Sequence, residues 1–409
     1  MTSKSRKVAW GRLIRRTMGL SLSSSFLLLG LAVSNANEAE SATLAATQSL
    51  GQYIVLGYND LGMHCLGSRY DEICILPPAN TMRATVIRRG AEPEIMDGDV
   101  TLRYSIPGNT TSVTKTNFWD YAYPLFGANL LPDIGLFGKG MTGTMDPTTD
   151  GDWIAAAIPI TPITDAGIEN PYQLASITVS LSGQYLAATQ AVIPVSWEMR
   201  CDSCHNTKGI TPETDILRKH DRLHGTQLES QKPVLCARCH ADPALGLPGD
   251  PSVSNLSHAM HKSHANRKFP GKAQMMNACY ACHPGPKTQC MRDVHYTRAG
   301  NVCVSCHGTM AAVANPARRP WVDQPRCGNC HHEQGHEYEQ PGVLYRDSKG
   351  HGGVKCEACH GSPHAIAPTR QPNDNVQAIA LQGHAGTISE CAVCHTTQPT
   401  EAFFHSREH

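Results

Sequence analysis

The chain has 409 residues, of which 40% are hydrophobic and 17% are charged. Its 35 basic residues equal its 35 acidic residues, so the formal net charge is zero. A chain with no basic excess is a poor candidate for nucleic-acid binding.

Residues 1–36 are typical of a signal peptide. Six basic residues and no acidic residue precede an apolar run over 18–33, and small residues follow up to Ala36, where we expect cleavage. The alternatives are an uncleaved membrane anchor, for which the run is short, and twin-arginine export, which the residues after Arg15 and Arg16 fit poorly. Removal of these six basic residues leaves 29 basic and 35 acidic residues, so the mature protein should be acidic. No later stretch is apolar enough to suggest a membrane span.

Residues 37–198 predict an all-β, sandwich-like domain. Short β-branched runs separated by Gly, Pro, Asn and Asp clusters are the pattern of antiparallel strands. The predicted strands cover 53–58, 84–89, 100–106, 154–163, 174–181 and 186–197.

Two cysteines of this region, Cys65 and Cys74, are close in sequence. In an exported protein such a pair predicts a disulfide. His64 could alternatively cap a haem or bind a metal.

Residues 199–409 contain the sequence Cys-x-x-Cys-His seven times, and we number these motifs 1 to 7 in chain order. The cysteines are Cys201, Cys204, Cys236, Cys239, Cys279, Cys282, Cys303, Cys306, Cys327, Cys330, Cys356, Cys359, Cys391 and Cys394. The histidines are His205, His240, His283, His307, His331, His360 and His395. This is the attachment signal of haem c, in which two thiols bond to the haem and the His becomes the proximal iron ligand.

Structural zinc is the main alternative for repeated Cys-x-x-Cys pairs. It gives no reason for a His after every second Cys, so we expect seven covalently attached haem c groups. Seven motifs leave too little chain for a side-chain core around each, and we expect a mostly irregular domain with short helices. One such helix should begin at 211–213 and end near Gly225.

The same region contains 13 histidines outside the motifs, which is more than seven distal iron positions require. The preferred distal candidates are His220, His224, His258, His261, His264, His295, His351, His364 and His384. His332, His336, His405 and His409 are less favoured, and Met310 is an alternative ligand. Cys290 is the one cysteine of this region outside the motifs, and it is either a buried spectator or a thiolate near a haem.

The runs HGGVKCEACHGSPHA (351–365) and ACHPGPKTQCMRD (281–293) resemble segments of multihaem cytochromes from metal-respiring and related bacteria. The resemblance covers about residues 199–409. It implies closely spaced haems with two His ligands each, serving electron transfer.

These patterns favour an exported electron carrier, in the periplasm or at the cell surface, that passes electrons between redox partners or to an extracellular acceptor. The partners could be other cytochromes or copies of this chain. One alternative is a multihaem reductase or oxidase of a small nitrogen or sulfur compound, although no motif has Lys in place of His. Another is a subunit of a conductive filament.

Overall fold

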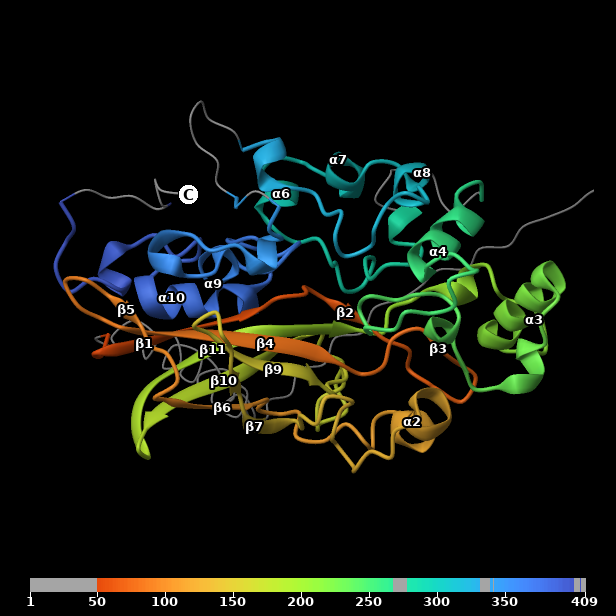
Figure 1. Cartoon of the computed structure of the whole chain (residues 1–409), viewed down its shortest axis with the longest axis horizontal. Coiled ribbons are helices and arrows are strands. Elements are labelled where there is room, and N and C mark those ends of the chain that lie inside the picture. Colours follow the sequence, from red (N-terminus) through yellow and green to blue (C-terminus); the bar gives the residue numbers. More distant parts are fainter. Residues whose placement is uncertain (1–49, 268–277, 332–338, 341, 401–404, 406–409) are drawn as a thin grey trace, which may run out of the picture. The chain divides into compact units, whose positions relative to one another are not determined.

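The computed structural model describes residues 50–267, 278–331, 339–340, 342–400 and 405 (Figure 1). The expected signal peptide therefore lies outside the described residues. The strands are β1 (Tyr53–Asn59), β2 (His64–Cys65), β3 (Ile73–Cys74), β4 (Asn80–Arg88), β5 (Glu94–Ile95), β6 (Thr101–Ser105), β7 (Thr142–Thr144), β8 (Asp146–Pro147), β9 (Trp153–Ile158), β10 (Tyr172–Leu181), β11 (Gln184–Ser196) and β12 (Val234–Leu235). The helices are α2 (Phe118–Phe126), α3 (Pro212–His224), α4 (Leu256–His264), α6 (Val294–Thr297), α7 (Cys303–His307), α8 (Met310–Val313), α9 (Cys356–His360) and α10 (Val376–Gln382).

The region before residue 199 is built on two sheets. One has the order β1-β4-β9-β8, with β5 added to β4, and the other has the order β2-β11-β10-β6-β7. Neighbouring strands are antiparallel, except that β2 runs parallel to β11. The long strands lie where the β-branched runs predicted them, so the β-rich part of the expected fold is confirmed.

The two sheets share one apolar core. Val55 and Trp153 come from the first sheet, and Ile177 and Ile193 come from the second; each of these side chains is at most 2% exposed. A core filled by the facing sides of two sheets is the arrangement of a β-sandwich.

The described part of this β-rich region, which we had expected to be all β, contains the helix α2. In α2, Phe118, Ala122 and Leu125 follow a spacing of four and three residues, so they share one face and are buried beside Tyr70. The helix ends at Gly127, whose φ of 70° favours glycine. Its aromatic composition and internal proline concealed the helical spacing.

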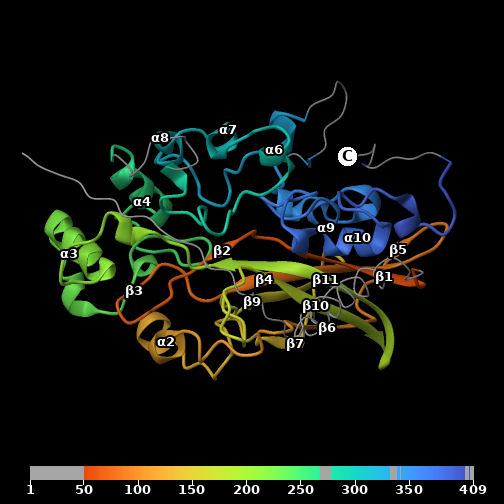
Figure 2. The ribbon, with the colours of Figure 1, turned by 180° about the vertical axis from the view of Figure 1, so that it is seen from behind.

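Short helices and irregular segments make up the chain after residue 199. The helix predicted after 211 is confirmed as α3, because the Thr211 side chain accepts a hydrogen bond from the Thr214 N–H at its start and Gly225 ends it. Figures 1 and 2 show α9 and α10 on one side of the first sheet, and they show α4, α7 and α8, which precede these helices in the chain, away from them.

Strand β1 has both faces buried because the C-terminal region packs against its outer side. Ile54, Leu56 and Tyr58 pack with Ala358 of α9 and with Val393. This explains why β1 is a continuous apolar run and does not alternate.

Hydrogen bonds join the same surfaces. The Gly57 N–H of β1 donates to the Gln377 side chain of α10 at 2.7 Å. Arg89 donates to the carbonyls of Ala392 and Val393. The described residues from 50 onward accordingly belong to one compact unit. In the described part of the chain, no helix has the length and apolar character needed to cross a membrane.

Candidate functional site: seven facing histidine pairs

The Cys-x-x-Cys-His motifs adopt tight helical turns. Motifs 4 and 6 are the α-helical turns α7 and α9. In the other five, the backbone N–H of the motif His donates to the carbonyl of the first Cys at 2.8 to 3.0 Å. Such a turn places both cysteines and the histidine of a motif around one point, as attachment to a single group requires.

Each motif histidine faces a second histidine from elsewhere in the chain. The pairs, given with the motif residue first, are His205–His264, His240–His220, His283–His261, His307–His364, His331–His295, His360–His405 and His395–His351. Their ring centroids are 5.9 to 6.4 Å apart. Direct ring packing would allow closer approach, as His220 and His224 show at 4.8 Å.

This separation fits one metal ion between two imidazoles. A metal–nitrogen bond to His is about 2.0–2.1 Å and a ring nitrogen lies about 1 Å from its ring centre, so two such bonds in line separate the centroids by about 6 Å. Among the described residues, no group of three or more His, Cys, Asp or Glu side chains could hold a metal ion. The facing histidines thus offer two imidazoles at each position, whereas structural zinc takes four ligands.

Hydrogen bonds at the Nδ1 atoms orient several of these rings. His261 and His264 contact the carbonyls of Ser257 and Met260 through Nδ1, each at 2.7 Å. The same contact joins Nδ1 of His395 to the carbonyl of Ala91, at 2.9 Å, and ties motif 7 to the β-rich region. A partner at Nδ1 leaves Nε2 available as a metal ligand and fixes the ring's direction.

Carboxylates support two further rings. Nδ1 of His205 lies 3.3 Å from Asp215, and Nδ1 of His295 lies 3.3 Å from Asp293. A carboxylate at this position is a common outer partner of metal-binding His, because it raises the basicity of the ligand.

Burial keeps the central imidazoles neutral. Burial is the main cause that lowers the pKa of both His283 and His307 to about 4, and the nearby His364 contributes to each of these shifts. A neutral imidazole is the form that binds a metal, so these rings are ready to act as ligands at neutral pH.

Six of the preferred distal candidates face a motif histidine, namely His220, His261, His264, His295, His351 and His364. His224 lies beside His220, His258 is buried within α4, and His384 is 3.4 Å from Glu390. His405, which we had favoured less, faces His360. His332, His336 and His409 lie outside the described residues.

Cys65 and Cys74 are both free thiols, so the structure does not contain the predicted disulfide. They lie in β2 and β3, which pair with different strands, β11 and β12. Cys65 interacts electrostatically with Cys290, and Cys74 with Cys236. Nearness in sequence misled us because the chain between them carries each to a different neighbour. His64 contacts the Pro77 carbonyl at 2.7 Å.

The motifs follow one another in space in a definite order. His261 and His264 lie one turn apart on α4 and face motifs 3 and 1, so these two motifs are neighbours. The thiols of Cys279 and Cys303 interact electrostatically, so motifs 3 and 4 are neighbours. Further thiols of different motifs interact electrostatically: Cys201 with Cys236, Cys204 with Cys282, Cys306 with Cys330, Cys327 with Cys356, and Cys359 with Cys394. The order is therefore 2-1-3-4-5-6-7.

Comparisons of the chain with protein-family models, with curated protein sequences and with solved structures find no match.

Proposed function

We propose that this protein is an exported multihaem cytochrome c that carries electrons along seven haem groups between redox partners or to an extracellular acceptor. The observation that carries the proposal is the pairing of every motif histidine with a second imidazole at the separation that one iron requires. Each haem, when bound, would supply a one-electron couple at its iron.

Three sets of residues would hold each haem. The motif cysteines would form the thioether bonds, the motif histidines would bind one face of each iron, and the facing histidines would bind the other. The Nδ1 contacts keep the rings directed at one another. An iron held by two histidines would have no open position for a substrate, which favours a carrier over a reductase or oxidase.

The order of the motifs supports transfer along a row. Each motif has neighbours on the row, so an electron can pass between adjacent groups without a long step through protein. Motifs 2 and 7 are the ends of the row, and we propose them as the places where electrons enter and leave.

Production of the chain with a cytochrome c maturation system tests this function. The mass of the intact protein should exceed that of the polypeptide by seven haems, and the oxidised spectrum should be low-spin, with all axial positions filled. Fewer covalent haems, or a substantial five-coordinate high-spin population, would contradict the proposal. Steady-state assays with nitrite, hydroxylamine and tetrathionate should show no turnover.

A further inference from the structure

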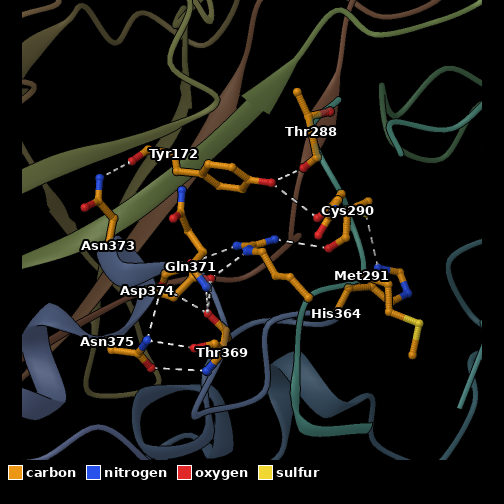
Figure 3. Close-up of polar contacts among 12 residues, drawn as sticks. Tyr172, Thr288, Cys290, Met291, His364, Thr369, Gln371, Asn373, Asp374 and Asn375 are labelled. Atoms are coloured by element: carbon orange, nitrogen blue, oxygen red, sulfur yellow. Dashed lines mark hydrogen bonds and ion pairs between the residues drawn. The ribbon is translucent and has the colours of Figure 1, made fainter. Parts of the chain in front are cut away.

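Cys290, one of the three cysteines outside the motifs, contacts one of the proposed iron ligands. Its Sγ atom lies 3.6 Å from Nδ1 of His364. The His364 ring in turn faces His307 of motif 4, with the ring centroids 5.9 Å apart. Figure 3 shows the Cys290 side chain directed at the His364 ring.

The backbone holds these two residues together. The Arg292 N–H donates to the His364 carbonyl at 3.0 Å, so the segment that carries Cys290 is hydrogen bonded to the segment that carries His364. His364 has a φ of 64°, a left-handed conformation that side chains rarely adopt. Surrounding structure must therefore impose the position of this histidine.

The buried side chain of Arg292 holds the loop that carries Cys290 in place. Arg292 is 1% exposed, and its guanidinium donates two hydrogen bonds to Asp374, at 2.5 and 2.8 Å. It also donates to the Cys290 carbonyl at 3.1 Å and lies over the Tyr172 ring. The ring hydroxyl of Tyr172 contacts the carbonyls of Thr288 and Gln289 (Figure 3). Cys290 thus lies in a loop fixed at several points.

Sulfur distinguishes this ring from the other facing histidines. The Nδ1 contacts of His220, His261, His264 and His295 are all to oxygen. A sulfur neighbour at Nδ1 gives the motif 4 iron a ligand environment of its own, and partners at this atom tune the electron donation of the imidazole.

We propose that Cys290 is a positioning residue that directs His364 at the motif 4 iron and, by accepting the Nδ1–H, lowers the reduction potential of that haem. The inference rests on the proposed function, because it needs a haem between His307 and His364. Acceptance of the proton by sulfur makes the imidazole a stronger donor, which favours the oxidised iron.

Redox titration of the haem-loaded protein, followed by electron paramagnetic resonance, tests this role. In C290A, the potential of one haem should rise and one low-spin signal should change, while the other six stay as they are. In C290S the hydroxyl can still accept the Nδ1–H, so most of the change should be reversed. C65A is the matched control, since Cys65 is a nearby non-motif thiol whose sulfur contacts the Met63 carbonyl and, among the described residues, none of the proposed iron ligands.

Identical potentials and signals in C290A and the native protein would overturn the proposal, as would an equal shift in C65A. If C290A fails to retain seven haems, C290V fills the space without an acceptor and carries the same expectation and the same contradiction. A native protein with fewer than seven low-spin haems would instead contradict the proposed function. The two failures are therefore distinguishable.

Discussion

The two regions of this chain are stabilised in different ways. Before residue 199, two sheets enclose a core of their own side chains, such as Val55, Trp153 and Ile193. After residue 199, every buried apolar cluster found in the described residues also contains side chains from the first region. The motif region therefore has two sources of order, its contacts with the sheets and the groups it is proposed to bind. The difference indicates that the motif region, which has little apolar core of its own, can fold by packing against the β-rich region.

Removal of haem should separate the two regions most clearly. In a chain produced without haem attachment, the backbone amides of β1, β4, β10 and β11 should still be protected from hydrogen exchange. The amides of the motif turns should exchange quickly, because these turns lack a core of their own. Hydrogen exchange measured by mass spectrometry gives the comparison residue by residue. Equal protection in both regions would show that the motif region is stable without its haems.

Truncation of a side chain in the sandwich core should lower the stability of the β-rich region. Trp153 is 2% exposed, so W153A should cost about 3–5 kcal/mol through lost burial and a cavity. Tyr185 is 65% exposed in β11, and Y185A should change stability by no more than about 0.5 kcal/mol. Denaturant unfolding of the haem-free chain, followed in the β-rich region, measures both. A similar loss in the two variants would contradict the assignment of the core.

Within the motif region, His405 and His384 provide a sharper test. His405 faces His360 and His384 faces no motif histidine in the described residues, so H405A should leave one haem of the seven with a single protein ligand. One seventh of the haem should then become high-spin in the optical and paramagnetic resonance spectra. H384A should retain seven low-spin haems. The reverse result would mean that the C-terminal pairing is different.

The smallest effect should be on the pH dependence of stability, and it should come from the buried acidic side chain of Glu357, near the β-rich region. Burial raises the pKa of Glu357 well above its ordinary value of 4.5, with a further rise from Asp60, so the folded protein holds this proton more tightly than the unfolded chain does. The resulting stability is complete below pH 4.5 and is lost as the pH rises through the folded pKa.

The variant E357Q should therefore flatten the fall in thermal midpoint above pH 4.5. Part of the slope should remain, because burial also raises the pKa of Asp60. An unchanged slope in E357Q would show that Glu357 has an ordinary pKa in the folded protein.

Features that depend on local sequence patterns were predicted from the sequence, whereas features that depend on long-range contacts were mostly not. The strands and α3 follow from periodicity and from capping residues such as Thr211 and Gly225, which act within a few positions. The motif turns are equally local. Which histidine faces which motif depends on contacts between distant segments, and spacing carries no information about them. His405 follows the last motif yet faces His360 of motif 6, while Cys65 and Cys74 are close in sequence and join different strands.

A structure of the haem-loaded protein tests the central claim most directly, because it shows the fourteen axial ligands. The account predicts seven irons, each between one motif histidine and the partner named above, in the order 2-1-3-4-5-6-7. An iron bound by a single histidine, or by His224, His258 or His384, would contradict it.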